Sequence, residues 1–522
     1  MRALLVRVLL LAGCVLALPA GRAFSLQGAF DTWQTAEIGY QLNADLGGPM
    51  NLGEEYRVNI PMLTYGFDES FLNYFGAKGV EEVDKAMQVF NDLPEFSAMS
   101  ADLSEFPLDT RRFNHRATAL YLYDVRSFAM AAMLEFLGLA PAERYVWTLR
   151  NRTVINNVPY YSVLKRNFDP VSFQPSSYVN NVLYTYIILQ TYTTPTWEAV
   201  EFEVDPSMPS VTSVSAFNLS GGTILASGIY ALATPGLFYT GLTRDDVAGL
   251  RYLYRTENYN VESLATNAVL APINAQEGNY MLTADTGSGS GFGQPPGGTN
   301  VVTTTNAPVA TALRPGVNKI SLVRVDYDSQ LGLWVAVTNR FRDRYITNST
   351  LRTQQLERTL AQPDILFSAY DIGPTPNGDQ FFLVRTISWA TQDTLNGTTT
   401  LGGPGLIQPP MTFSFSKVGQ YLLNIGDGGE VDGLPNFWWG TYDGTTAEPI
   451  IYPSGASLSE LERLVLEGAV SDDGENPWLA PPSTTTTTTG TGTTTGTGTG
   501  GAGGGGVGGG GAGFGGGTGA IP

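Results

Sequence analysis

The stretch that is most informative about the fold is LTRDDVAGLRYLY, residues 242–254. Thr243 suits the N-cap of a helix, and Asp246 is the acid at the third helical position. Asp245 and Asp246 also complement the positive end of a helix dipole. Val247 and Leu250 then recur at helical spacing, so the stretch predicts a capped helix that faces a core.

Two further segments upstream have apolar side chains at helical spacing, and both end at helix-stop residues. Residues 78–91 end just before Pro94. Residues 124–139 end with Gly138 followed by Pro141. In contrast, residues 182–189 are rich in β-branched and aromatic side chains, which predicts a buried strand. The region before residue 265 therefore reads as α+β.

The rest of the chain changes in composition along its length. Residues 266–310 are rich in Gly, Pro and Thr, which is typical of a linker. Residues 311–455 contain short strand-like runs separated by turn formers, which favours an all-β, sandwich-like domain; residues 351–360 alone suggest a short helix. The predicted layout is a signal peptide (1–23), an α+β domain (24–265), the linker (266–310), the β domain (311–455), a short helix with an extended segment (456–482), and a disordered Thr/Gly tail (483–522).

The first residues have the features of a secretory signal peptide. Arg2 and Arg7 precede a short apolar run, and small residues lead to a cleavage site after Ala23. Cys14 follows a Leu-Ala-Gly sequence, so a lipoprotein anchored through Cys14 is the alternative address. Cleavage after Ala23 removes three Arg and takes the formal net charge from -19 to -22. We predict export to the periplasm, cell surface or medium, with no transmembrane segment.

Residue counts exclude several classes of site. The chain has one His and one Cys. A catalytic zinc ion usually needs about three protein ligands, commonly His, and a disulfide needs two Cys. The net charge of -19 argues against a nucleic-acid partner, because phosphate binding relies on clustered Lys and Arg. We expect no cofactor other than a possible structural calcium ion.

The helix at 242–254 also resembles the closing helix of matrixin-type (metzincin) peptidases. Those proteins run Leu-Thr-x-Asp-Asp-Val/Ile-x-Gly-Ile/Leu, two residues and Leu-Tyr, and Leu253-Tyr254 complete the match here. Arg255 stands where the family usually has Gly. The resemblance implies a matrixin-like domain over residues 24–265, with residues 78–91 as its first helix and residues 124–139 as its zinc helix.

The resemblance also implies that the zinc site is lost. An active zinc helix reads His-Glu-x-x-His-x-x-Gly, and Gly138 aligns with the closing Gly. Ala131 then replaces the first His, Ala132 the general-base Glu, and Glu135 the second His. The third ligand would fall at Pro141. Alanine cannot bind zinc, so we predict no catalytic residues at these positions.

Other sequence features suggest weaker candidates for sites. Asp427, Glu430 and Asp432 stand on a Gly-rich acidic turn that could bind calcium through oxygen ligands. Trp438, Trp439 and Tyr442 could form a flat binding surface for a peptide or sugar. The remaining candidates, each with a plain structural alternative, are His115 beside three Arg and the carboxylates Glu198, Glu201 and Glu203 of one predicted strand.

Together these features predict a non-catalytic exported protein. It would be a surface or secreted binding or structural protein on a pseudo-peptidase scaffold, with an extracellular protein or glycan as partner. The alternative is a secreted peptidase or glycosidase that uses carboxylates instead of a zinc helix.

Overall fold

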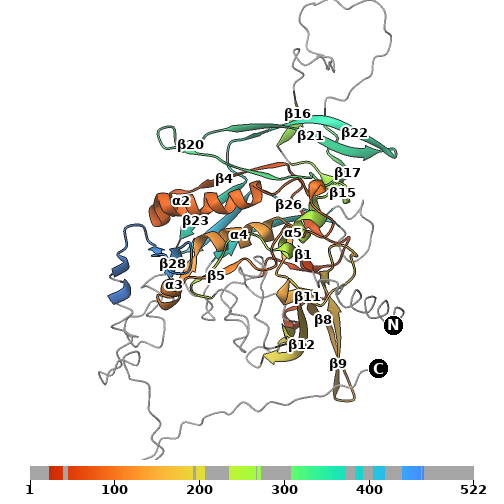
Figure 1. Cartoon of the computed structure of the whole chain (residues 1–522). Helices are drawn as coiled ribbons and strands as arrows, with labels where there is room; N and C mark the ends of the chain where they lie inside the picture. Colours follow the sequence, from red (N-terminus) through yellow and green to blue (C-terminus); the bar gives the residue numbers. More distant parts are fainter. Residues whose placement is uncertain are drawn as a thin grey trace, which may run out of the picture. The chain divides into compact units, whose positions relative to one another are not determined.

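The computed structural model describes most of the chain up to residue 463. The described ranges are 23–38, 45–191, 196–205, 234–265, 267–271, 307–370, 383–391, 404–417, 438–459 and 461–463. They all belong to one compact unit, residues 1–468, and none belongs to the second unit, residues 469–522. The fold is mixed and rich in strands, which form several sheets (Figure 1). The predicted signal peptide up to residue 22 and the predicted tail lie outside the described ranges.

A five-stranded sheet forms the centre of the fold. Its strands stand in the order β18-β4-β23-β27-β24, and only the edge strand β24 runs antiparallel to its neighbour. The strands are β4 (Met62–Phe67), β18 (Ser321–Arg324), β23 (Ile365–Tyr370), β24 (Leu383–Arg385) and β27 (Met411–Ser416). The strands predicted around residues 320–325 and 411–415 are confirmed.

The central sheet corrects the predicted division into two domains. β4 comes from the predicted N-terminal domain and lies between two strands of the predicted β domain. One hydrophobic core also contains residues from both, including Phe71, Phe128, Phe367 and Phe413. A central strand needs hydrogen-bond partners on both edges, and β4 finds them beyond the predicted linker. Residues 311–455 therefore do not form a separate sandwich.

The helix α2 (Glu69–Asn91) follows β4 directly and packs on the central sheet. Asp68 caps it, accepting a hydrogen bond from the Phe71 amide at 2.9 Å. Gly76 interrupts the helical backbone with a φ of 60°. The helical spacing at 78–91 thus predicted only the part after this kink. The part before it brings Phe71 and Phe75 against the aromatic rings of β23 and β27.

The helices α4 (Val125–Phe136) and α5 (Arg244–Tyr254) confirm the other two predicted helices. Asp124 caps α4, and α5 has the predicted capping box, in which Thr243 and Asp246 exchange hydrogen bonds. After α4, Gly138 has a φ of 103°, and an added Cβ would lie 2.3 Å from the Tyr56 carbonyl oxygen. Glycine is therefore needed at this helix end.

A second five-stranded sheet stands in the order β15-β17-β21-β22-β16 (Figure 1). Its strands are β15 (Tyr259–Ser263), β16 (Ala268–Leu270), β17 (Thr311–Pro315), β21 (Val337–Thr347) and β22 (Thr350–Leu360). The segment 351–360, for which a short helix was an option, is part of the long β21–β22 hairpin. Its alternating exposed and buried side chains fit a strand rather than a helix.

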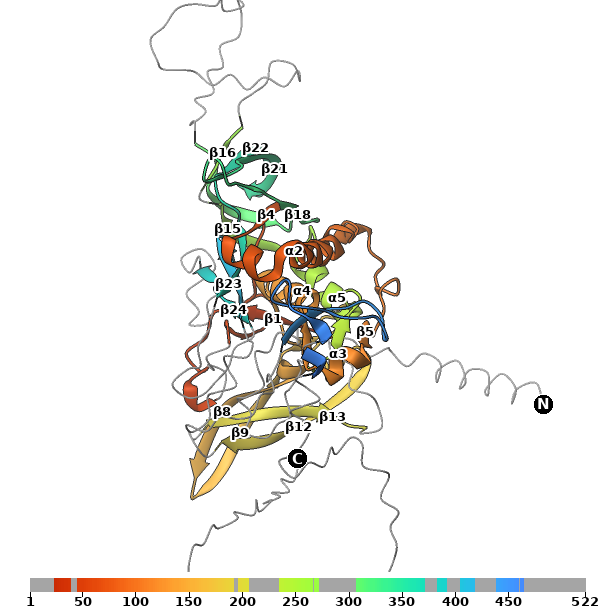
Figure 2. The same ribbon diagram turned by 90° about the vertical axis from the view of Figure 1, so that its left-hand side faces the viewer.

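Two smaller sheets lie in contact through β13 and β8 (Figure 2). One is the hairpin of β8 (Trp147–Ile155) and β9 (Val158–Lys165). The other contains β11 (Tyr178–Val179), β12 (Val182–Thr191) and β13 (Thr196–Glu203). The strand predicted at 182–189 is confirmed, but its predicted burial is wrong, because Leu183 and Ile187 are exposed on a face that no other described element covers. On β13, however, Glu201 is buried while Phe202 is exposed. The polarity of a side chain therefore does not show which face of this strand is covered.

The remaining elements are short. They are α3 (His115–Ala119), the 3-10 helices η1 (Ala36–Ile38), η2 (Phe96–Ala98) and η3 (Glu143–Tyr145), and the strands β1 (Phe24–Gly28), β2 (Gly48–Met50), β3 (Tyr56–Arg57), β5 (Arg111–Phe113), β6 (Leu122–Asp124), β7 (Leu139–Ala140), β10 (Asn167–Phe168), β14 (Leu237–Tyr239), β19 (Tyr327–Asp328), β20 (Leu333–Trp334), β25 (Ser388–Thr391), β26 (Gly405–Gln408), β28 (Trp438–Thr441) and β29 (Ile450–Ile451). Among the described ranges, no helix has the length and apolar character to cross a bilayer.

Candidate functional site

Three candidate positions, Ala131, Ala132 and Glu135, lie on the helix α4 inside the core. Every residue of α4 except Arg126 is buried, and Ala131 and Ala132 are fully covered. Glu135 is also buried and pairs with Arg385 of β24. Arg385 Nε lies 2.5 Å from Glu135 Oε2, and Nη2 donates to Oε1 at 3.2 Å. This part of α4 therefore packs against protein and holds a buried ion pair.

The aromatic candidates do not form an exposed binding surface, which corrects the sequence hypothesis. Trp439 on β28 is 1% exposed, and its Nε1 donates to the Ser416 carbonyl at 2.6 Å. Tyr442 is 4% exposed, and its hydroxyl donates to the Leu122 carbonyl at 3.1 Å. Both rings are covered because their polar atoms find backbone acceptors inside the protein. For Trp438 the structure describes only the backbone, in β28.

Of the remaining charged candidates, the structure places His115 and the carboxylates of β13. Asp427, Glu430 and Asp432 lie outside the described residues. His115 is exposed at the start of α3, and its backbone N–H donates to the Thr445 carbonyl. Within the described ranges, no three His, Cys, Asp or Glu side chains are grouped as metal ligands.

Two of the three candidate carboxylates of β13, Glu198 and Glu201, are buried, whereas Glu203 is half-buried. Glu198 lies 3.4 Å from the Nε of Arg144, whose guanidinium also pairs with Asp45. Glu201 accepts a hydrogen bond from the Trp147 amide at 2.9 Å. Burial raises the pKa of the Glu198 carboxyl to about 7, although Arg144 acts in the opposite direction. Because Glu198 and Asp45 share the single cation Arg144, the protonated form of one of the two carboxyls is favoured.

The raised pKa of Glu198 predicts a pH-dependent stability. Its folded pKa lies above its unfolded value, so its contribution to stability is full below about pH 4.5 and is lost as pH rises to about 7. The difference corresponds to about 3 kcal/mol. We expect the urea midpoint of the wild type to fall across this range, and Glu198→Gln to make that fall smaller. An equal fall in Glu198→Gln would assign the pH dependence to other groups, such as the buried Asp124, whose pKa burial raises to about 6.

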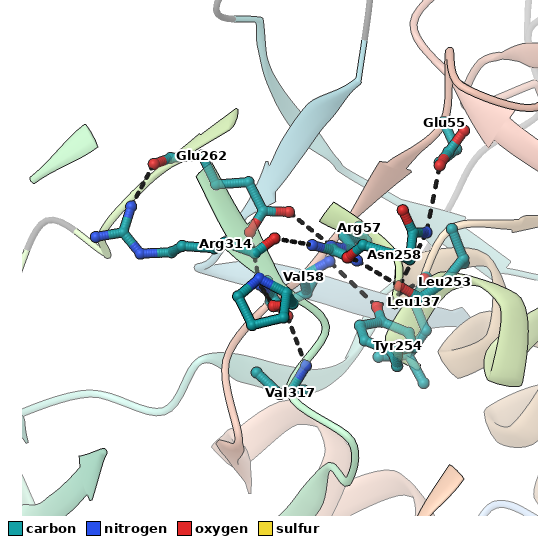
Figure 3. Close-up of polar contacts among 12 residues, drawn as sticks. Glu55, Arg57, Val58, Leu137, Leu253, Tyr254, Asn258, Glu262, Arg314 and Val317 are labelled. Carbon is teal, nitrogen blue, oxygen red and sulfur yellow. Dashed lines mark hydrogen bonds and ion pairs between the residues drawn. The ribbon is translucent and has the colours of Figure 1, made fainter. Parts of the chain in front are cut away.

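A buried polar network that the sequence analysis missed joins β3, the edge strand of the three-stranded sheet β25-β26-β3, to α5 and to the second sheet (Figure 3). Arg57 of β3 is fully buried, and its Nε lies 2.6 Å from Glu262 Oε1 of β15. Its Nη1 donates to the carbonyls of Leu253 and Asn258, at 2.5 and 3.1 Å, and Nη2 donates to the Arg314 carbonyl at 3.2 Å. One guanidinium thus holds four separate segments.

Arg314 extends this network, and Arg358 forms a separate buried ion pair. Arg314 of β17 forms a bidentate pair with Asp343 of β21, with Nε–Oδ1 at 3.0 Å and Nη2–Oδ2 at 3.1 Å. Arg358 of β22 pairs with Asp364 at 2.6 Å. Asp364 also accepts a hydrogen bond from the Thr64 amide of β4 at 3.0 Å. Bidentate pairs of this kind fix the orientation of both partners.

These residues line a cavity of about 390 Å³. The size is within the usual range for small-ligand pockets, about 300–1,000 Å³. Its charged side chains are Glu262, Arg314, Asp343, Arg358 and Asp364, and each is already paired within the protein. The cavity walls therefore satisfy their own charges, and the paired groups serve to join the two sheets. An isolated Arg in an apolar strand, such as Arg314, was the only sequence signal for this site.

Comparison with known proteins identifies no relative of this chain. No protein-family model, curated protein or solved structure matches this chain significantly.

Proposed function

We propose that this chain is an exported, non-catalytic binding or structural protein on a scaffold that resembles a matrixin-type peptidase without its metal site. The observation that carries the proposal is the state of α4. Ala131 and Ala132 are fully buried, and Glu135 is neutralised by Arg385. Zinc hydrolysis needs an open metal position for water and a free general base. The α4 positions offer neither a second ligand nor space beside Glu135.

The helices support the proposed ancestry, whereas the central sheet does not, because four of its five strands come from beyond residue 265. The first helix, α2, directly follows the strand β4, as expected for matrixins. Gly138 closes α4 with a positive φ, and α5 has the capped Thr-Arg-Asp-Asp start on which the resemblance rests. For export, the support is the position of β1, which begins at Phe24, directly after the predicted cleavage site.

Purified chain expressed from Phe24 onwards tests the proposal. We expect no stoichiometric zinc by elemental analysis and no casein cleavage, because α4 has neither metal ligands nor an accessible base. An active zinc peptidase assayed in parallel shows that the assay works. Stoichiometric zinc together with cleavage that a chelator abolishes would refute the proposal. Cleavage that persists in chelator would instead support the alternative, a hydrolase that uses carboxylates.

A further inference from the structure

A groove with a cavity volume of about 470 Å³ lies between η1 and the β8–β9 hairpin. Its polar walls include Thr35 and Glu37 from the η1 side and Arg150, Asn151 and Arg152 from β8. It is separate from α4 and from the network around Arg57. No sequence feature pointed to it.

A β-bulge places three consecutive side chains of β8 on this groove. In the pairing of β8 with β9, Leu149 lies opposite Val163 and Asn151 lies opposite Ser162, so Arg150 has no partner residue. Regular alternation would turn every second side chain away from the groove. A bulge breaks that alternation and redirects side chains, as it often does near functional sites. Arg150, Asn151 and Arg152 therefore line the same space.

Two tryptophans hold the two guanidinium groups in place. The Arg150 guanidinium carbon lies 4.5 Å from the centre of the Trp33 ring. That of Arg152 lies 3.9 Å from the centre of the Trp197 ring. A guanidinium that stacks on an aromatic face keeps its N–H edge free for a planar acceptor. The stacking fixes both arginines before any ligand arrives.

Donor atoms of these arginines have no acceptor in the part of the chain that the structure describes. Arg150 Nη1 and Arg152 Nε are buried nitrogen atoms without a hydrogen-bond partner there. The Nε of Arg166, the residue after β9, is likewise buried without a hydrogen-bond partner there. A buried donor without an acceptor is unfavourable, so a bound acceptor would stabilise each of them.

The surrounding charges favour an anion rather than a cation. Burial and the neighbouring Arg150 both lower the pKa of Arg166, while Glu54 and Asp31 raise it. Glu37 is the one acidic side chain on the groove, and it is exposed. Arg166 does not line the groove itself, but an anion bound to Arg150 and Arg152 would offset the positive charge that Arg150 places near Arg166.

We propose that this groove binds an oxyanion, the carboxylate or sulfate of a small acidic ligand. The N–H edges of Arg150 and Arg152 match the two oxygens of a planar carboxylate. The hydroxyl of Thr35 and the amide of Asn151 supply further polar contacts on the walls. The site stands whether or not the chain is a pseudo-peptidase, because none of its residues belongs to α4.

Isothermal titration at low ionic strength tests the site with four probes: glucuronate, succinate, inorganic sulfate and glucose. Glucuronate and glucose differ in charge but share a sugar ring. We expect the three anions to bind and glucose not to bind. Arg150→Gln and Arg152→Gln should each weaken binding about tenfold or more, because each removes a charged donor. Binding of glucuronate alone would identify a sugar acid, whereas equal binding of all three would identify the oxyanion itself.

Matched variants separate the site from general charge and from folding. Arg150→Lys keeps the charge but loses the planar edge, so we expect it to bind more weakly than wild type. Arg340→Gln removes an exposed cation of β21, paired with Glu357, and should leave binding unchanged. The inference is overturned if no anion binds to wild type, if glucose binds as tightly as glucuronate, or if Arg150→Gln and Arg152→Gln keep the wild-type circular dichroism and bind normally.

Discussion

Replacing Arg57 by Met should lower the free energy of unfolding by about 3–5 kcal/mol. The substitution leaves the fully covered Glu262 without its cation, 2.6 Å away in the wild type. It also removes hydrogen bonds to the carbonyls of Leu253, Asn258 and Arg314. Burial already raises the pKa of the Glu262 carboxyl, so the variant is expected to take up a proton there on folding. Urea unfolding at neutral pH measures the loss.

The control for Arg57 is an arginine whose ion pair is exposed. Arg340 lies 2.6 Å from Glu357 on the β21–β22 hairpin, and its side chain is 51% exposed. Pairs of this kind contribute about 0–1 kcal/mol, so Arg340→Met should change stability little. Equal losses in Arg57→Met and Arg340→Met would show that the network around Arg57 does not hold β3 against the second sheet.

The second large effect is expected at Glu135. Glu135→Leu leaves Arg385 charged and buried, which should cost about 3–5 kcal/mol. The double variant Glu135→Leu/Arg385→Met replaces both charges with apolar groups of similar size, and we expect it to recover most of the loss. A double-mutant cycle with urea unfolding gives the coupling between the two positions.

This cycle also bears on the proposed absence of catalysis. If Glu135 only pairs with Arg385, the double variant should be stable and should keep any ligand binding of the wild type. A double variant that is as unstable as Glu135→Leu, or one that loses a measurable hydrolytic activity, would give Glu135 a role beyond the ion pair.

The helices could be predicted because their signals are local. Thr243 and Asp246 cap α5 with contacts inside one turn, and Gly138 ends α4 through its own backbone conformation. α2 was predicted only from residue 78. Gly76 breaks the helical backbone between the two parts, although Phe71 and Phe75 before it also have the i, i+4 spacing of a helix.

The pairing of strands could not be predicted in the same way. Alternation shows which side chains of a strand share a face, but it does not show which strand lies beside it. β4 has its neighbours in β18 and β23, and nothing in residues 62–67 points to residue 321 or 365. The composition change at residues 266–310 therefore looked like a domain boundary, although the sheet continues across it.

The candidate sites also differ in this way: some depend on residue types alone, and others on contacts between distant segments. That Ala131 and Ala132 can neither bind a metal ion nor act as a base can be read directly from residue types. Whether Trp439 is exposed or covered depends on the rings of Phe75, Phe128 and Phe415, which come from three distant segments. Likewise, Arg150 and Arg152 became a candidate site only through their contacts with Trp33 and Trp197.

The central position of β4 has a consequence for how the chain folds. Met62 pairs with Ser321, 259 residues later, so β4 leaves the ribosome long before either of its neighbours is made. Until then, α2 has no completed sheet to cover its Phe71 and Phe75. Sheets closed by such distant pairings fold slowly and expose apolar surface on the way. The N-terminal third therefore cannot complete its place in the central sheet until residues 321–370 have been synthesised.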